Sequence, residues 1–133
     1  NWDGIVERMG TLFENMVNLS KYNSEEYNKE KYEQMLTLIH EHYCDDGFCR
    51  DTIAEEVKMS IKSMEQVFKR RENKSITNYI FEYRMAKAKM LLDETDLSIK
   101  EVAEKVGYSN VSHFIQNFKK TYTITPDKYR KNR

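Results

Sequence analysis

Two short segments of the chain combine hydrogen-bonding side chains with a basic pair that follows them. Their members are Lys62, Glu65, Gln66, Lys69 and Arg70 in the first segment, and Ser112, His113, Gln116, Lys119 and Lys120 in the second. Lysine can donate to guanine, glutamine can pair with adenine, and glutamate can accept from cytosine. Basic side chains also bind phosphate groups without reading sequence. The chemistry that these residue types could perform is recognition of a nucleic acid.

Catalysis and metal binding have much less support in the sequence. No P-loop, paired carboxylates or activated nucleophile is evident, so we expect no enzyme and no cofactor. Cys44 and Cys49 lie near His40 and His42, which makes a zinc site an alternative. Residues two apart point to different sides of a helix, which argues against both histidines binding one ion. We interpret the cysteines as reduced thiols and the histidines as surface residues of a cytosolic protein without a metal.

The two segments end a longer pattern that occurs twice. Residues 53–60, with the sequence IAEEVKMS, return as residues 102–109, with the sequence VAEKVGYS. Each copy then reaches a phenylalanine followed by two basic residues, at Phe68 and at Phe118. The offset is 49 residues in the first part and 50 at the phenylalanine, so the second copy has one extra residue after Ser109. A repeat of this content is typical of two helix-turn-helix units in tandem.

The elements that hold these segments are all expected to be helices, since the chain has one proline, four glycines and many helix-forming residues. The apolar periodicity predicts helices over residues 25–43, 50–57, 61–71, 76–93, 99–106 and 111–121, and a short one that begins at Pro126. We therefore predict an all-α fold, with two tandem helix-turn-helix units at about 48–72 and 97–121 joined by a long central helix at about 76–93. On that helix the residues expected to face the core are Ile76, Tyr79, Ile80, Tyr83, Ala86, Met90 and Leu91.

An amphipathic helix is predicted ahead of these units, over residues 2–19. Its apolar residues recur at spacings of three and four: Trp2, Ile5, Met9, Leu12, Met16 and Leu19. The stripe could form a homodimer contact, end a longer signalling helix or pack on the rest of the chain. The first residue is Asn1 and not Met, so we expect a fragment of a longer protein or a processed product. In it, residues 1–24 end an upstream region and residues 25–133 form the main domain.

The net charge of zero conceals an asymmetry along the chain. Residues 1–47 hold four basic and ten acidic residues, whereas residues 48–133 hold eighteen basic and twelve acidic residues. The repeat therefore lies in the basic part, as binding to a polyanion such as DNA requires. No apolar run approaches the roughly 20 residues that would span a bilayer.

The second copy of the repeat and its flanks resemble the DNA-binding domain of AraC/XylS-type transcription regulators. The resemblance rests on residues 86–92 (AKAKMLL), 99–103 (IKEVA), 106–109 (VGYS), Phe114, 118–120 (FKK) and 125–130 (TPDKYR), and it extends over about residues 30–131. It implies a bacterial transcription factor that binds double-stranded DNA in the cytoplasm, with RNA polymerase as a further partner. In this family a signal normally enters through an attached ligand-binding or phosphoacceptor domain, and nothing in residues 1–47 resembles a complete one.

The resemblance also implies where the DNA contacts lie, because the second helix of such a unit enters the major groove and reads bases mainly from its N-terminal part. The expected base-reading residues are Lys62, Ser63, Glu65 and Gln66 in the first unit, and Asn110, Ser112, His113 and Gln116 in the second. The expected phosphate contacts are Ser60, Lys69, Arg70, Ser109, Lys119 and Lys120.

Two such units on a helix of ~27 Å would reach adjacent major-groove segments, ~34 Å apart, and read an asymmetric bipartite site. The alternative is a helical protein-interaction module that does not bind DNA.

Four positions depart from the family's pattern. Lys58 stands in the first turn where the second turn has Gly107, and a positive φ there would carry a modest cost. Asn73 and Thr123 follow the second helices of the units, where the family often has glycine. Asparagine tolerates the left-handed region better than threonine. We therefore expect the connection after the second unit to have a different backbone conformation from the one after the first. Arg50 occupies a position where an apolar residue is common.

Overall fold

The structure is a computed structural model, and it describes residues 24–132. Every regular element within those residues is a helix, which confirms the all-α prediction. The chain divides into two compact units, Asn1–Gln34 and Met35–Arg133, and the elements labelled below belong to the second. The helix predicted over residues 2–19 lies outside the described residues. No helix in the described part of the chain is long and apolar enough to cross a membrane.

The first helix-turn-helix unit follows a helix over residues 24–42 and a turn with Gly47 at φ 78°. It consists of α2 (Arg50–Val57) and α3 (Ile61–Glu72), whose ends differ from the predicted bounds by at most one residue. Lys58 ends α2 in the left-handed conformation, at φ 58° and ψ 48°. The turn therefore has the positive φ that its glycine counterpart indicated, and a lysine adopts it.

The second unit repeats this design with α5 (Ile99–Lys105) and α6 (Val111–Tyr122), and α7 (Pro126–Lys131) follows. Its turn uses Gly107 at φ 95°. Asn110, rather than Ser109, is the N-cap of α6. The extra residue of the second copy falls at this point, so Asn110 takes the structural place that Ser60 has in the first copy.

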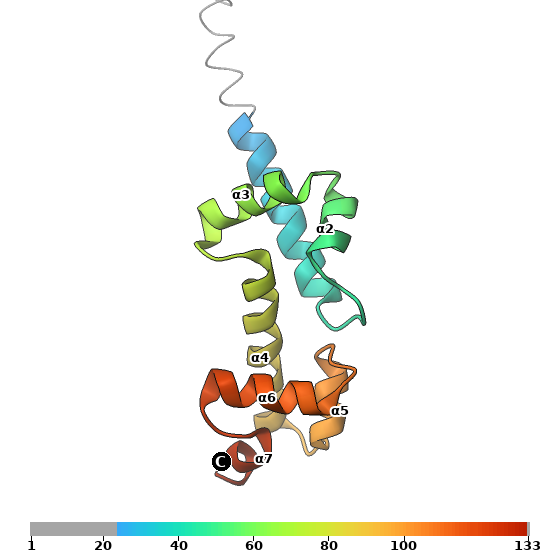
Figure 1. The fold of residues 1–133 in the computed structure, drawn as a ribbon, viewed down its shortest axis with the longest axis vertical. Helices are drawn as coiled ribbons and strands as arrows, with labels where there is room; N and C mark the ends of the chain where they lie inside the picture. The colour runs from blue at the N-terminus through green and yellow to red at the C-terminus, as the bar shows by residue number, and fades with distance from the viewer. Residues whose placement is uncertain (1–23, 133) are drawn as a thin grey trace, which may run out of the picture. The chain divides into compact units, whose positions relative to one another are not determined.

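The long helix α4 (Ile76–Glu94) joins the two units, with α2 and α3 near one end and α5, α6 and α7 near the other (Figure 1). Its buried residues are Ile76, Ile80, Met85, Ala88 and Leu92. The prediction that Ala86 and Met90 face inward is wrong, since both are exposed. One continuous stripe was expected. The helix instead serves two cores, and its buried positions shift by five residues between Ile80 and Met85 as it passes from one to the other.

Each unit buries its own set of apolar side chains. In the first they are Met35, Ile39, Phe48, Ile53, Ala54, Val57, Met64, Phe68, Ile76 and Ile80. In the second they are Met85, Ala88, Leu92, Val102, Ala103, Val106, Phe114 and Phe118. Ala54 and Ala103 occupy matching places on α2 and α5, where a small side chain allows the two helices of a unit to approach closely.

The helices α3 and α6 end in the same way. Asn73 (φ 62°) and Thr123 (φ 68°) are both left-handed, and their backbone N–H groups donate to the carbonyls of Lys69 and Lys119. The expectation that Thr123 would give a different connection is wrong. The hydrogen bond to Lys119 and the packing of Tyr129 of α7 on the core hold threonine in a conformation that its branched Cβ disfavours.

Candidate nucleic-acid interface

The helix α3 presents a polar face on the side away from its buried Met64 and Phe68. The exposed residues of this face are Lys62, Ser63, Gln66, Lys69 and Arg70. Ser60 caps the helix: its Oγ accepts from the backbone N–H of Ser63 at 3.1 Å and donates to Ser63 Oγ at 2.9 Å. The cap fixes the start of the helix, so the side chains of its first turn project from a defined backbone.

The helix α6 has the same arrangement around its buried Phe114 and Phe118. Its exposed residues include Ser112, His113, Gln116, Lys119 and Lys120. Asn110 caps this helix, because its Oδ1 accepts from the backbone N–H of His113 at 3.1 Å. The oxygen of this predicted base-reading side chain is thus held by the helix, and its amide group is the part that can donate elsewhere.

Glu65 was expected on the exposed face of α3, and the structure places it differently. Its side chain is only 23% exposed, and its Oε1 lies 3.9 Å from Nη1 of Arg50. Its Oε2 accepts from the backbone N–H of Ile76, the first residue of α4, at 3.3 Å. A carboxylate at this position satisfies a free N–H and complements the positive end of the α4 dipole. We therefore remove Glu65 from the base-reading set and assign it to the junction of α3 and α4.

The predicted phosphate-binding residues lie at the two ends of the recognition helices. Ser60 and Ser109 are exposed at the turn before each helix, although only Ser60 is a cap. The basic residues Lys69 and Arg70 lie in the last turn of α3, and Lys119 and Lys120 lie in the last turn of α6. Arg71, which is not in the predicted set, is also exposed in the last turn of α3 and continues the basic run.

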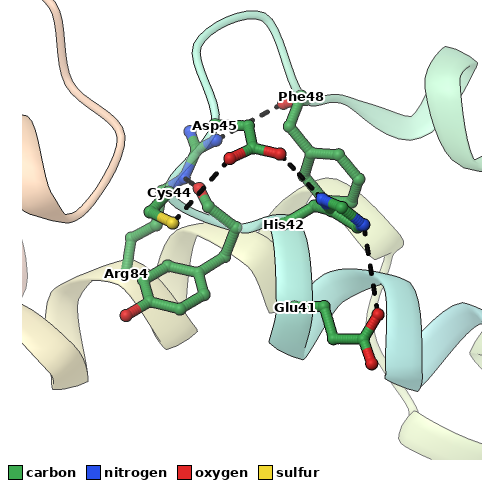
Figure 2. A network of polar contacts seen from close by, with 7 residues as sticks. Glu41, His42, Cys44, Asp45, Phe48 and Arg84 are labelled. Atoms are coloured by element: carbon green, nitrogen blue, oxygen red, sulfur yellow. Dashed lines mark hydrogen bonds and ion pairs between the residues drawn. The ribbon is translucent and has the colours of Figure 1, made fainter.

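The histidines near the cysteines have separate partners, as their spacing indicated. His40 Nε2 lies 3.0 Å from the Tyr79 hydroxyl. His42 Nδ1 instead lies 2.7 Å from Asp45 Oδ2, as Figure 2 shows. Both cysteines are exposed thiols. Among residues 24–132, no group of three or more His, Cys, Asp or Glu residues is arranged to hold a metal ion.

Two capped helices, each with an exposed polar first half and a basic last turn, are thus carried on one connecting helix. This is the arrangement of a tandem helix-turn-helix domain, in which the second helix of each unit is the DNA-reading element.

Comparison with known proteins gives the same class. Residues 53–132 match the family described as "Helix-turn-helix domain". The xylose operon regulatory protein of Haemophilus influenzae is 39% identical over 80 residues, which are 60% of this chain and 21% of that protein. The C-terminal domain of the two-component response regulator yesN from Fusobacterium nucleatum is 38% identical, with a TM-score of 0.71, and the match covers 74% of this chain and 95% of that domain.

A third match is a transcriptional regulator of Chromobacterium violaceum with an AraC-type DNA-binding domain. It is 26% identical with a TM-score of 0.68, over 77% of this chain and 90% of that one. The chain therefore belongs to the helix-turn-helix family of AraC-type transcription regulators, and it is a sequence-specific DNA-binding domain. It spans 21% of the length of the Haemophilus regulator.

Proposed function

We propose that one copy of this chain reads an asymmetric, bipartite site in double-stranded DNA, with α3 and α6 in two adjacent major-groove segments. The observation that carries the proposal is that α3 and α6 both contact α4, which has 19 residues. Such a helix is ~28 Å long. Successive major-groove segments on one face of the duplex are ~34 Å apart. Bending of the DNA would close the remaining difference.

Base reading is assigned to the first two turns of α3, and to the N-cap and first two turns of α6. The side chains are Lys62, Ser63 and Gln66 on α3, and Asn110, Ser112, His113 and Gln116 on α6, all of them exposed. Counted from the first residue of each helix, Lys62 corresponds to Ser112 and Ser63 to His113, while only the glutamines are alike. The two helices therefore offer different hydrogen-bonding groups, and the two half-elements should differ in sequence.

Phosphate binding is assigned to Ser60, Lys69 and Arg70 beside α3, and to Ser109, Lys119 and Lys120 beside α6. These side chains are exposed and flank the proposed base readers. Contacts of this kind set the position of each helix on the duplex and do not distinguish sequences.

For the whole protein we infer transcription regulation in a bacterial cytoplasm, with RNA polymerase as a partner and residues 2–19 as a homodimer contact. The support is the family, the similarity to the xylose operon regulatory protein of Haemophilus influenzae, and the apolar spacing of residues 2–19.

Selection of bound sequences from a random DNA pool tests the proposal. The unchanged chain should enrich two different half-elements about one helical turn apart. Gln66→Ala should relax the preference at one or two positions of one half-element, and Gln116→Ala should do so in the other. The discrimination lost at each position is about 1–3 kcal/mol, the value of a good bidentate pair. Fluorescence polarisation on the selected site and its single-base variants measures it.

Gln34→Ala is the matched control, since Gln34 is exposed on the helix over residues 24–42 and lies outside both helix-turn-helix units. It should leave every base preference unchanged. A uniform loss of affinity across all sequences from both recognition-helix variants would overturn the assignment of base readers. An unchanged chain that shows no salt-sensitive binding to any DNA would favour the protein-interaction module instead.

A further inference from the structure

Arg84 lies in the middle of α4, and its side chain contacts parts of both helix-turn-helix units. Its Nε donates to the backbone carbonyl of Tyr43 at 2.8 Å, and its Nη2 donates to the backbone carbonyl of Phe48 at 3.4 Å. Figure 2 shows the Arg84 side chain extending from α4 to the loop that contains Cys44 and Phe48. This loop leads from the helix over residues 24–42 into α2, so Arg84 ties α4 to the start of the first unit.

The same side chain also contacts the turn of the second unit. The guanidinium carbon lies 5.8 Å from the centre of the Tyr108 ring, a distance at which a cation is attracted to an aromatic face. The neighbouring Gly107 lies so close that a Cβ built on it would be 2.7 Å from the Tyr43 carbonyl oxygen and 3.2 Å from Arg84 Nε. The turn of the second unit and the loop of the first therefore meet at Arg84.

A groove that is open to solvent borders this meeting point. A cavity of about 330 Å³ lies there, lined by residues at the start of α2, by α4 residues that include Arg84, and by Tyr108. Tyr43 and Phe81 pack against the core of the second unit nearby. The polar contacts of Arg84 thus join the two units beside a groove that is open to solvent.

An arginine suits this position because its guanidinium is planar and presents several fixed donors. Burial lowers the pKa of Arg84 by desolvation, yet its charge is retained, since arginine is protonated far above neutral pH. Hydrogen bonds from a charged group to backbone carbonyls are about twice as strong as neutral ones. A lysine could reach only one of the two carbonyls in a comparable geometry.

We propose that Arg84 is a positioning residue that fixes the orientation of α3 relative to α6 and so selects the spacing between the two half-elements of the DNA site. The inference rests on the bipartite site proposed above. Each inserted base pair moves one half-element ~3.4 Å along the duplex and rotates it by ~34°. A rigid pair of units would tolerate one spacing, whereas a loosened pair would tolerate several.

Measurement of affinity against a spacing series tests the inference. The selected half-elements are separated by the selected distance and by one or two base pairs more or less, and the full chain is titrated against each duplex. The unchanged chain should lose about tenfold or more for each step, because two linked contacts are strong only where geometry allows both. Arg84→Met, which keeps the aliphatic length, should lose about threefold or less for each step. Arg84→Lys should lie between these two.

Lys87→Met is the matched control, because Lys87 is on the same helix and lies 5.4 Å from the Tyr83 ring centre rather than at the second unit. It should keep the steep spacing dependence. If the unchanged chain shows no dependence on spacing, the bipartite site itself fails. If the unchanged chain shows it and Arg84→Met keeps it, the role of Arg84 fails while the bipartite site stands. Loss of binding to each isolated half-element by both Arg84 variants would also overturn the inference, since Arg84 would then be needed to fold the units.

Discussion

Glu65 and Arg50 show how the interiors of the two units differ at the scale of single residues. By position in the repeat, Arg50 corresponds to Ile99 and Glu65 to Ile115. Both isoleucines pack against the core of the second unit, whereas Arg50 and Glu65 lie 3.9 Å apart as an ion pair. The departure of Arg50 from the family's apolar pattern therefore goes together with a carboxylate on the facing helix.

Glu65→Ala is expected to lower the free energy of unfolding by about 1–2 kcal/mol, because the Ile76 N–H loses its acceptor and Arg50 keeps only Asp51 as a carboxylate partner. Base preference should stay unchanged, since the carboxylate is turned toward α4. Urea denaturation followed by circular dichroism measures the first effect, and repeated selection from random DNA measures the second.

Gln66→Ala provides the opposite pattern at the next residue. Its side chain is exposed, so the free energy of unfolding should change by less than about 0.5 kcal/mol while base preference relaxes.

The double variant Arg50→Ile with Glu65→Ile, which copies the second unit, should recover most of the stability, because an apolar pair can replace an ion pair without loss. A change of preferred base from Glu65→Ala at unchanged stability would return Glu65 to the base-reading set.

The exposed side chains of α3 and α6 were predictable from helical spacing, but the position of Glu65 was not. Spacing tells which side of a helix a residue occupies, and Glu65 lies at the edge between the two sides. Its acceptor role depends on the backbone N–H of Ile76, eleven residues further along the chain. Such a contact depends on how α3 and α4 cross, and the helical spacing of residues along the chain does not predict that crossing.

The elements themselves follow closely from local signals, with one systematic exception. The caps Ser60, Ser75, Ser98 and Thr125 each accept from an N–H three residues on, and the helices begin where these residue types predict. On α4 the predicted buried face is wrong at Ala86 and Met90, which are exposed. A helix that contacts two cores has two apolar faces, and a single period cannot describe both.

Thr123 lies in the connection between α6 and α7. Thr123→Gly is expected to raise the free energy of unfolding by about 0.5–1 kcal/mol. Threonine adopts φ 68° here, a conformation that costs an L-residue roughly 1–2 kcal/mol, and part of the gain is offset by the greater freedom of glycine in the unfolded chain. Thermal denaturation should show a higher melting temperature.

Asn73→Gly is the control for this effect, since Asn73 occupies the matching position at φ 62°. Asparagine tolerates the left-handed region better than a branched residue, so the melting temperature should change much less than with Thr123→Gly. Equal gains from the two changes would mean that strain at the branched Cβ of threonine is not the cause.

Charge is distributed unevenly along the whole chain, and the basic part is the one that holds the proposed DNA-binding helices. Acidic residues outnumber basic ones in residues 1–47, and basic residues outnumber acidic ones in residues 48–133, where α3 and α6 lie. The zero net charge therefore understates the attraction of the basic part for DNA, because screening limits each charge to about 8–10 Å at physiological salt. The acidic segment has little influence on contacts further away than that.

Lys120→Ala tests this electrostatic division at the level of the complex. Each phosphate contact that is removed should reduce the slope of log K against log salt by about 0.9, because one fewer counterion is released on binding. Affinity should fall by a similar factor for selected and random DNA. Lys74→Ala is the control, because the Lys74 ammonium is already paired with Glu82 Oε2 at 2.6 Å. Removing it should change the number of counterions released from the DNA by less than Lys120→Ala does. Its slope should stay close to that of the unchanged chain. A Lys120→Ala variant that loses affinity only for the selected site would show that Lys120 reads bases and does not bind phosphate.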